Sequence, residues 1–547
     1  MRSDTHPISG ALYEEMGDGL VKITKDDLSG IFHWETGYVK GDIVTPDVHY
    51  LQHIGGPQLV NSSLEEIAKE AGDKANDSYH GTVRDPRRTA TGRVMFQNEG
   101  VPAVAKYVGD PGRMTDTGMR SAGPTFQELV EGDSHPELVP ETLKEDSPLP
   151  GGVMKVSTDR LYTQEYHDLE VERLWKRVWQ FACREDDIPE VGDYLVYDIA
   201  HLSYIVVRVD ATTFKAYNNV CLHRGRQLRE YDGKNATEFR CPFHGWSWEI
   251  DGSLREIPSE WDFPEVREEA EHLVDAQVGT WGGFVFINPD PNCEPLEDFL
   301  GSLPEHYERW NFEDRVKISH VAKIVRANWK LTQEAFCEGY HVMATHPQSM
   351  VGGGDGSNMS YDAFGNWCRA TATGSGGTSP QRGLYPPIEE IFAGRKAGAD
   401  NIREALRPVM GDKADDFCDA ELVDGYFNNL FPNFHPWGAF SRIVYRFRPY
   451  GDDPTMSIME VMYLVPWPEG QPKPPPVPIH WLGPDEPFTE AEEMGELGRV
   501  LNQDTYNLPK IQKGVKAKAQ PTIFLSSYAE SKVRHFHNLY DEWMSVE

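Results

Sequence analysis

The chain has 547 residues, which at about 150 residues per domain is enough for two to four domains with large cores. It carries 53 Lys and Arg against 87 Asp and Glu, and the net charge of −34 would repel phosphate backbones and anionic lipids, which argues against a nucleic-acid-binding protein. Hydrophobic residues make up 39% of the chain, which is typical of a folded protein and excludes general disorder.

The sequence lacks the features of a membrane or secreted protein. No run approaches about 18 uncharged apolar residues, and the first ten residues do not show the basic-then-apolar pattern of a signal peptide. The seven cysteines are few, odd in number and far apart, which argues against a disulfide framework. We therefore expect a cytoplasmic protein without structural disulfides.

The first third of the chain has few periodic patterns. Residues 1–150 contain many turn signals, such as Gly55-Gly56-Pro57, so we expect an irregular extension of unknown role that packs as an arm on the body or on a neighbouring subunit. Within residues 151–185, apolar side chains from Tyr162 to Phe181 recur at helical spacing, which predicts a helix packed on the larger domain described next.

The remainder of the chain divides into two predicted domains. Short apolar runs bounded by Gly, Asp and Asn predict strands and a small all-β domain over residues 186–292. Residues 293–547 mix helical and strand patterns, which predicts a larger α+β domain. Its clearest elements are expected helices around 328–345 and 488–508 and expected strands at 439–448 and 455–465. The predicted fold class is therefore α+β.

Two tight clusters in the β domain each contain one cysteine and one histidine. Cys221 and His223 form the first, and Cys241 and His244 form the second, with flanking Gly and Pro residues that suit tight loops. Thiolates and imidazoles bind zinc or iron–sulfur clusters. If the two sulfurs hold one iron and the two imidazoles the other, the pattern indicates a Rieske [2Fe–2S] cluster; zinc is the alternative. An isolated Cys or His would more often be an ordinary buried residue.

A second group of candidate ligands lies in the first predicted helix of the larger domain. Glu334 and Glu338 fall on its apolar stripe, where a carboxylate needs a charged partner or a metal. His341 and His346 would point about 140° apart on a regular helix, so the helix must end or distort between them, as Pro347 indicates. Two histidines and one carboxylate form the facial triad of non-haem Fe(II) oxygenases.

The third ligand of such a triad must come from elsewhere in the chain. Asp504 lies on the apolar stripe of a later predicted helix, together with Leu501 and Leu508, and we take it as the missing carboxylate. The alternative is that Asp504 caps a helix that restarts near Pro509.

Together these segments resemble the large (α) subunit of the Rieske non-haem iron aromatic-ring-hydroxylating oxygenases, from about residue 162 to the C-terminus. The family's cluster motif matches Cys221, His223, Cys241 and His244, and its Asn-Trp-Lys matches Asn328, Trp329 and Lys330. Its iron motif matches His341 and His346. Its late carboxylate, which precedes a Gln-x-Gly, matches Asp504 ahead of Gln512 and Gly514. The resemblance implies a Rieske-type [2Fe–2S] cluster, a mononuclear Fe(II), and a catalytic domain of the helix-grip type.

One position departs from the family pattern. Most members have Asp two residues before the Tyr-His pair, where this chain has Glu338, and some members that oxidise quaternary amines share this departure. In the family this acid bridges subunits, so the resemblance implies an electron path from a neighbouring subunit's His244 through Glu338 to His341. We take Glu338 and Asn328 as the candidate catalytic residues.

The resemblance implies the terminal oxygenase component of a multicomponent system. Electrons would come from a separate reductase, with or without a ferredoxin, because the chain has neither a dinucleotide GxGxxG nor a four-cysteine ferredoxin run. With O₂, the enzyme would hydroxylate or cis-dihydroxylate an aromatic or related organic substrate. The family also implies a trimer, with or without small β subunits.

Three other functions remain open on sequence alone. The first is a Rieske monooxygenase that carries out O- or N-demethylation or oxidises quaternary amines. The second is a non-catalytic Rieske electron carrier, for which the β domain would be enough. The third is a zinc-stabilised structural protein.

Overall fold

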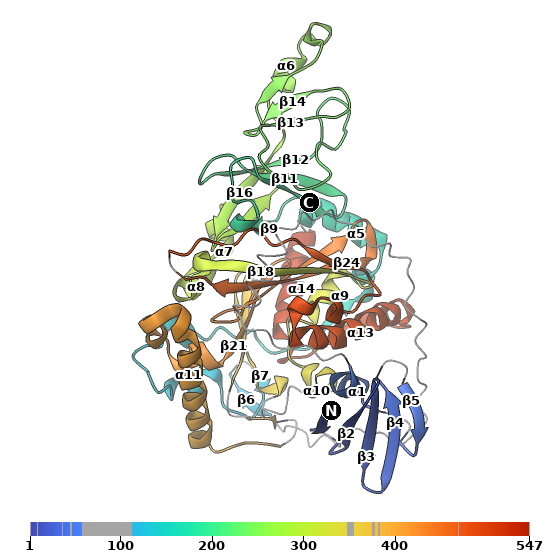
Figure 1. The fold of residues 1–547 in the computed structure, drawn as a ribbon, viewed down its shortest axis with the longest axis vertical. Coiled ribbons are helices and arrows are strands. Elements are labelled where there is room, and N and C mark those ends of the chain that lie inside the picture. The colour runs from blue at the N-terminus through green and yellow to red at the C-terminus, as the bar shows by residue number, and fades with distance from the viewer. Residues whose placement is uncertain are drawn as a thin grey trace.

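The structure is a computed structural model. It describes the chain except for residues 1, 8, 35–36, 44–45, 57–111, 117, 347–354, 375–377, 381–382, 469 and 546–547. Three parts follow one another along the longest axis of the molecule, with the small β domain at one end, the larger domain in the middle and an N-terminal module at the other end (Figure 1).

The N-terminal module comprises the described part of residues 2–56. Five strands form an antiparallel sheet in sequence order, and one helix packs on it: β1 Ser3–Thr5, β2 Leu12–Gly17, β3 Leu20–Lys25, β4 Leu28–His33, β5 Gly37–Gly41 and α1 Val48–Gly55. The module has its own core, in which Tyr13, Phe32 and Tyr50 are fully buried. The expectation of an irregular extension is therefore wrong for these residues. No strand buries more than two side chains, so the alternation is too short to stand out in the sequence.

Residues 112–184 run along the larger domain before the chain enters the small β domain. Their elements are β6 Arg113–Thr115, β7 Gly118–Arg120, α3 Phe126–Glu131, α4 Glu141–Lys144, β8 Met154–Ser157, α5 Gln164–Glu170 and β9 Gln180–Arg184. The helix predicted from Tyr162 to Phe181 is shorter than expected. It runs from Gln164 into a π-turn that ends at Trp175, because the chain then turns and Phe181 joins a sheet.

The small β domain consists of a six-stranded base sheet and a three-stranded tip. The base sheet has the order β10-β11-β12-β16-β17-β9, and the tip has the order β13-β14-β15. Their bounds are β10 Tyr194–Ile199, β11 Leu202–Arg208, β12 Phe214–Asn218, β13 Glu238–Arg240, β14 Ser247–Glu249, β15 Leu254–Glu256, α6 Val266–Glu269, β16 Asp275–Trp281 and β17 Phe284–Asn288. The tip packs on β11 and β12 of the base sheet through a small core that includes Cys221 and Cys241.

The larger domain is built on an eight-stranded sheet of order β19-β20-β21-β22-β23-β24-β18-β25, antiparallel except for the last pair. The strands are β18 Arg315–Val325, β19 Ser360–Phe364, β20 Trp367–Ala372, β21 Gly425–Leu430, β22 Phe434–Pro436, β23 Ile443–Tyr450, β24 Asp453–Pro466 and β25 His480–Leu482. The two strands expected at 439–448 and 455–465 correspond to β23 and β24.

Helices cover this sheet and its ends. They are α7 Leu296–Leu300, α8 Leu303–Tyr307, α9 Trp329–Glu334, α10 Val342–Thr345, α11 Ile388–Met410, α12 Asp419–Val423, α13 Glu496–Ala517 and α14 Ser531–Ser545, and β26 Thr522–Leu525 pairs with β8. The helix expected at 488–508 begins later, at Glu496, because two short 3₁₀ turns precede it. Mixed helices and strands in these positions confirm the predicted α+β class.

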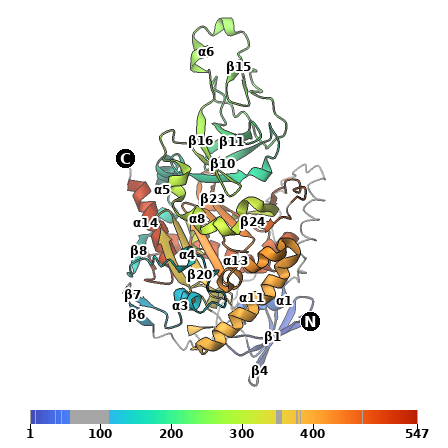
Figure 2. The same cartoon turned by 90° about the vertical axis from the view of Figure 1, so that its left-hand side faces the viewer.

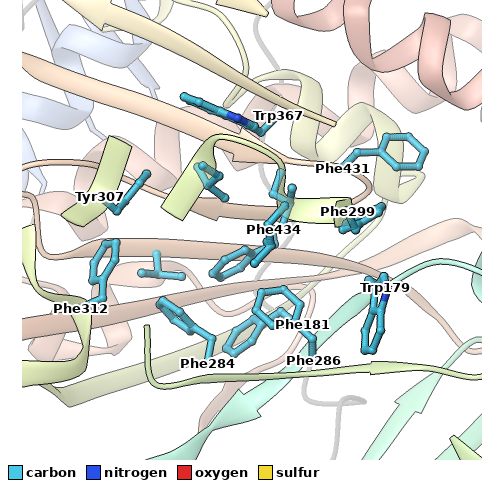
Figure 3. Packing of buried hydrophobic residues seen from close by; sticks show 14 of the residues in the cluster. Trp179, Phe181, Phe284, Phe286, Phe299, Tyr307, Phe312, Trp367, Phe431 and Phe434 are labelled. Carbon is cyan, nitrogen blue, oxygen red and sulfur yellow. The ribbon is translucent and has the colours of Figure 1, made fainter. Parts of the chain in front are cut away.

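An aromatic cluster joins the base sheet of the small domain to the larger domain (Figure 3). Phe434 of β22 lies 4.6 Å from Phe181 and 4.9 Å from Phe284, measured between ring centroids. Offset and edge-to-face ring pairs at such distances stabilise a core beyond the burial of their surface. The two domains are therefore packed as one body, and only the tip projects away from it (Figures 1 and 2).

Among the helices of the described residues, none combines the length and apolar character needed to span a membrane. All seven cysteines are free, as expected from their spacing.

Candidate metal centres

The four predicted cluster ligands meet on two neighbouring loops of the tip. The Cys221 thiol contacts the Cys241 thiol, and the imidazoles of His223 and His244 lie 4.7 Å apart between ring centroids. Both loops have the same backbone pattern, in which the glycine four residues after the cysteine donates its N–H to the cysteine carbonyl at 3.0 Å. Two sulfurs and two imidazoles thus face one another, as a Rieske cluster requires.

Glycine is required at the turn of each loop. Gly225 has a φ of +74° and Gly245 a φ of +81°, a left-handed conformation that L side chains rarely adopt. The turn brings the N–H groups of His223 and Arg224 onto the Cys221 sulfur, and hydrogen bonds to sulfur tune cluster potentials. The two cysteines are buried, whereas His244 is exposed at the surface of the tip.

The electrostatics of the loops suit metal ligation. Burial raises the pKa of the Cys221 thiol, while the backbone N–H groups of His223 and Arg224 oppose this by favouring the thiolate. Burial, with the charges of His244 and Arg224, lowers the pKa of His223, which favours the neutral imidazole that binds iron.

The second predicted ligand set also meets in space. One ligand atom from each of His341, His346 and Asp504 lies within 4.8 Å of the others. The short helix α10 separates the two histidines, and His346 leaves it with φ −125° and ψ 53°, so the predicted break brings the imidazoles to 5.2 Å between centroids. Pro347, which predicted this break, lies outside the described residues.

Asp504 sits inside α13, where Leu501 and Leu508 on the same stripe are buried against the large sheet. The alternative prediction, that Asp504 caps a helix restarting near Pro509, is therefore wrong, because α13 continues through Pro509 to Ala517.

Hydrogen bonds turn the Nε2 atom of both histidines toward Asp504. Glu338 accepts from Nδ1 of His341 at 2.6 Å, and Gln503 Oε1 accepts from Nδ1 of His346 at 2.8 Å. The two Nε2 atoms then lie 3.5 Å and 2.8 Å from Asp504 Oδ1. A metal-binding histidine usually donates its other N–H in this way, which fixes the tautomer and the ring orientation.

The charges of this group suit a divalent cation. Burial alone would lower the pKa of His341, but hydrogen bonds and charge from Asp504 and Glu338 raise it to about 10. Burial alone would raise the pKa of Asp504, but His346 and His341 lower it to about 2. The carboxylates therefore hold a proton on His341 that a metal ion would replace.

Two residues of the sequence prediction have other partners. Glu334, which lies on the predicted apolar stripe, is paired with His537 at 2.9 Å and not with the iron-site histidines, because α9 ends at Glu334. Asn328, proposed as catalytic, caps α9 by accepting from the Lys330 N–H, and its amide donates to the Pro454 carbonyl at 2.7 Å. Its side chain positions the helix.

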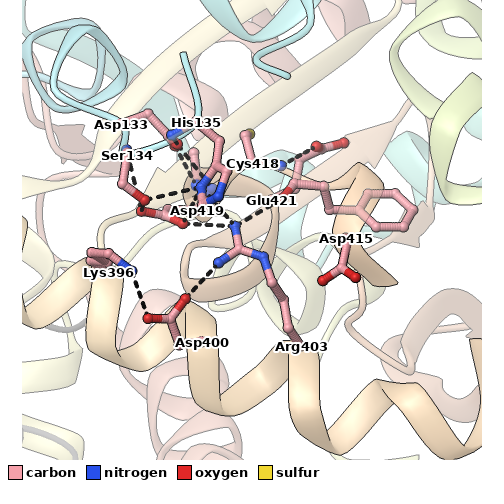
Figure 4. Close-up of polar contacts among 12 residues, drawn as sticks. Asp133, Ser134, His135, Lys396, Asp400, Arg403, Asp415, Cys418, Asp419 and Glu421 are labelled. Atoms are coloured by element: carbon pink, nitrogen blue, oxygen red, sulfur yellow. Dashed lines mark hydrogen bonds and ion pairs between the residues drawn. The ribbon is translucent and has the colours of Figure 1, made fainter. Parts of the chain in front are cut away.

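A further group of potential ligands lies between α11 and α12 (Figure 4). Donor atoms of Asp133, His135 and Asp419 lie within 4.8 Å of one another. The guanidinium of Arg403 donates to Asp419 at 2.8 Å, and the backbone N–H groups of Asp419 and Ala420 occupy Asp133. The Arg403 guanidinium already supplies the positive charge, and the carboxylate oxygens already accept hydrogen bonds. This cluster therefore fits a structural role, in which it holds these segments together.

Family models match both domains. The model of the Rieske [2Fe–2S] domain matches residues 178–267, and that of the ring-hydroxylating alpha subunit (catalytic domain) matches residues 304–546.

Curated relatives align over about half of their own length. The large subunit of anthranilate 1,2-dioxygenase from Acinetobacter baylyi is 31% identical over 36% of this chain and 43% of its own. The alpha subunit of biphenyl 2,3-dioxygenase from Rhodococcus jostii is 32% identical over 37% and 46%. The oxygenase subunit of glycine betaine monooxygenase from Chromohalobacter salexigens is 34% identical over 33% and 40%.

Solved structures share the fold. Naphthalene 1,2-dioxygenase from Rhodococcus sp. superimposes with a TM-score of 0.52 at 21% identity, covering 71% of this chain and 94% of that one. A quaternary ammonium Rieske monooxygenase with bound L-carnitine gives a TM-score of 0.52 at 16% identity, covering 71% and 95%.

Fold and site together define a protein with two iron centres, a [2Fe–2S] cluster on the tip of a Rieske domain and a mononuclear iron in the domain that follows. The chain therefore contains a Rieske [2Fe–2S] domain followed by the catalytic domain of a ring-hydroxylating alpha subunit.

Sequence reasoning missed two residues at the mononuclear centre. Gln503 directly precedes Asp504, and this position next to a candidate ligand was the one signal in the sequence that could have identified it. His49 of α1 lies against the same region: its carbonyl accepts from Gln503 Nε2 at 3.0 Å, and its imidazole faces Asn507 at 3.5 Å. No sequence pattern connects residue 49 with residue 503.

Proposed function

We propose that this chain is the terminal oxygenase component of a Rieske system. Electrons come from a separate reductase, directly or through a ferredoxin, and O₂ oxidises an aromatic or related organic substrate by hydroxylation or cis-dihydroxylation. The observation that carries the proposal is the convergence of His341, His346 and Asp504 in a chain that also presents two Cys-His loops.

The residues present fit both groups. Cys221, His223, Cys241 and His244 would hold the cluster, and His341, His346 and Asp504 would hold the iron. When bound, the cluster supplies one electron at a time and the iron supplies a site for O₂ with positions left open by three protein ligands.

The chain's own residues prepare the mononuclear site. Nδ1–H of His346 donates to Gln503 and Nδ1–H of His341 donates to Glu338, so Nε2 of both rings faces Asp504, where a bound metal ion would replace the proton shared with the carboxylate. Glu338 also accepts the backbone N–H of His341 at 3.0 Å. This carboxylate therefore fixes the ligand that lies on the proposed electron path.

The position of the two centres supports a path between subunits. The tip lies at one end of the molecule and α10 lies well away from it (Figure 1). Exposed aromatic side chains stand on the tip and beside Glu338, namely Tyr231, Phe243, Trp261 and Tyr340. We propose a trimer, alone or with small β subunits, in which a neighbour's His244 approaches Glu338.

A group of aromatic side chains near Asp504 supports the proposal that the substrate is an organic molecule. Phe336 and Trp437 lie 5.0 Å and 5.4 Å from Tyr445 between ring centroids. Burial, with the charges of Tyr463 and Asp504, raises the pKa of Tyr445. Nearby, the buried His435 Nδ1 and Trp437 Nε1 have no hydrogen-bond partner among the described residues. Such atoms need a partner, which a polar group of the substrate or a water molecule supplies.

Oxidation of a quaternary amine or demethylation is the second candidate. Glycine betaine monooxygenase and carnitine monooxygenase are among the relatives, and Glu338 stands where most of the family has Asp. Aromatic rings attract quaternary ammonium groups through their π faces. We propose a cytoplasmic enzyme in either case, and a place in the breakdown of aromatic compounds for the first candidate.

Metal content tests the proposal first. The purified protein should contain about three irons and about two acid-labile sulfides per chain, and dithionite reduction should give the EPR signal of a Rieske cluster with its low average g. Zinc without sulfide would indicate a structural protein. A cluster without further iron, even after addition of Fe(II), would indicate an electron carrier.

Labelled oxygen separates the two candidate reactions. A panel of aromatic acids and hydrocarbons and a panel of quaternary amines are supplied with ¹⁸O₂, NADH and a reductase. A cis-dihydrodiol that carries two labelled oxygens supports dioxygenation. A product with one labelled oxygen, or release of an aldehyde, supports the monooxygenase.

A further inference from the structure

The N-terminal module contacts the mononuclear centre although it lies outside both matched domains. The family models begin at residue 178, whereas the described part of the module lies within residues 2–56. Its helix α1 lies beside α13, the helix that carries Asp504 (Figures 1 and 2). Arg2 of the module also pairs with Glu496, at the first turn of α13, at 3.5 Å.

A chain of two hydrogen bonds runs from the module to a candidate iron ligand. The His49 carbonyl can only accept, so the Gln503 amide must turn its NH₂ group toward it, at 3.0 Å. Gln503 Oε1 then faces His346 at 2.8 Å and can only accept from Nδ1–H. This leaves His346 Nε2, 2.8 Å from Asp504 Oδ1, as the nitrogen that a metal ion would bind in place of the proton shared with the carboxylate.

The opposite orientation of this amide would oppose metal binding. If the Gln503 NH₂ group faced His346, Nδ1 would become the acceptor and the proton would move to Nε2. An Nε2 that carries a proton cannot ligate a metal through that atom. The carbonyl of residue 49 therefore selects the tautomer of His346 that binds iron.

The fold of the module sets the position of this carbonyl. Asp47 caps α1 by accepting the N–H groups of His49 and Tyr50, each at 3.0 Å. Asp47 is held in turn by Nε2 of His6 at 3.1 Å, and Tyr50 is fully buried in the module core. Loss of that core would release α1 from its place against Gln503.

We propose that the N-terminal module is an integral part of the mononuclear metal site, in which the His49 carbonyl orients Gln503 and thereby sets the ligating tautomer of His346. The proposal rests on the proposed function in that His341, His346 and Asp504 bind a metal.

Cobalt(II) binding to the full-length, cluster-containing protein tests the inference after chelators have removed the mononuclear metal. Gln503→Ala removes the side chain that links the His49 carbonyl to His346. Phe32→Ala removes a buried ring and so destabilises the core of the module. The matched control for Phe32→Ala is Phe524→Ala, at a phenylalanine on β26 that is 55% exposed. Hydrogen exchange of residues 48–55 reports whether α1 has been released.

Gln503→Ala should weaken cobalt binding by about 10–100-fold, the usual effect of losing a residue that orients a ligand. Phe32→Ala should release α1 and weaken cobalt binding by at least about tenfold, with the cluster EPR unchanged. Phe524→Ala should bind cobalt as the wild type does.

Wild-type affinity in Phe32→Ala protein with α1 released would overturn the inference. If Phe32→Ala leaves α1 protected, Gln503→Ala decides alone, and wild-type affinity in that variant overturns it. Failure of the wild-type protein itself to bind cobalt or iron at this site would instead overturn the proposed function.

Discussion

The two centres of this protein differ in how far apart their residues lie in the sequence. All four candidate cluster ligands lie within residues 221–244, in a tip that packs on two strands of the base sheet. The candidate ligands of the mononuclear centre lie at the two ends of α10 and in α13, and their hydrogen-bond support comes from as far away as α1. The first centre is a property of two local loops, whereas the second depends on how distant segments pack.

The largest effect is expected from removal of a cluster ligand. Cys221→Ala should abolish the [2Fe–2S] cluster, because the loop then offers one imidazole and no thiolate, while the mononuclear iron remains. Acid-labile sulfide, EPR and iron content measure both centres in one sample. Cys183→Ala, at a buried cysteine of β9, is the control and should retain the sulfide. Loss of the mononuclear iron together with the cluster in Cys221→Ala would contradict the independence of the two centres.

Asp504→Ala should have the converse effect. Removal of a ligand should weaken mononuclear iron binding by more than the about 10–100-fold typical of a residue that only orients a ligand, with sulfide and cluster EPR unchanged. Glu334→Gln is the matched control, because this nearby acid pairs with His537 and not with the ligand histidines. Unchanged iron stoichiometry in Asp504→Ala would remove Asp504 from the ligand set.

Glu338→Gln tests the connection between the centres. Both metals should remain, but electron transfer from the cluster should slow by at least about tenfold, which corresponds to about 1.4 kcal/mol in the barrier. The measurement is the rate at which O₂ reoxidises the reduced cluster in a single turnover with substrate bound. Reoxidation at the wild-type rate would show that Glu338 does not lie on the path.

The smallest effects are expected at two glycines. Gly225→Ala places a side chain at φ +74° and should destabilise the first cluster loop by about 1–2 kcal/mol. Gly514→Ala, in α13, meets nothing within 4 Å and should stabilise the helix by about 0.5–1 kcal/mol. Thermal unfolding measured with the cluster absorbance and with far-UV circular dichroism gives both values. Equal effects would argue against the strained turn at Gly225.

How much of the site can be predicted from the sequence depends on the same difference between residues that are close together in the sequence and residues that are far apart. The candidate cluster ligands could be predicted from the sequence because all four, with their characteristic spacing and flanking glycines, lie within one short segment. The break in the helix between His341 and His346 could be predicted from helical geometry. Asp504 could be predicted as a ligand because it lies among leucines on the apolar stripe of its helix. Gln503 and His49 were not readable, because their roles depend on one packing contact between segments far apart in the sequence.

Errors in predicting the fold have physical causes as well. The N-terminal sheet was missed because its strands are short and each buries few side chains. The role assigned to Asn328 came from the family motif, whereas its contacts show a helix cap. Glu334 was placed on a helical stripe with Glu338, but the helix stops before Glu338 is reached.

The way the tip is packed has a consequence for the life of the protein. The base sheet is fixed to the larger domain through rings such as Phe181 and Phe434, whereas the tip is held on β11 and β12 by a small core that contains both candidate cluster cysteines. Regions with few buried contacts of their own open independently of the rest. We therefore expect a chain without its cluster to keep a folded body and an open tip, so that the cluster can be inserted, or replaced after oxidative damage, without refolding of the enzyme.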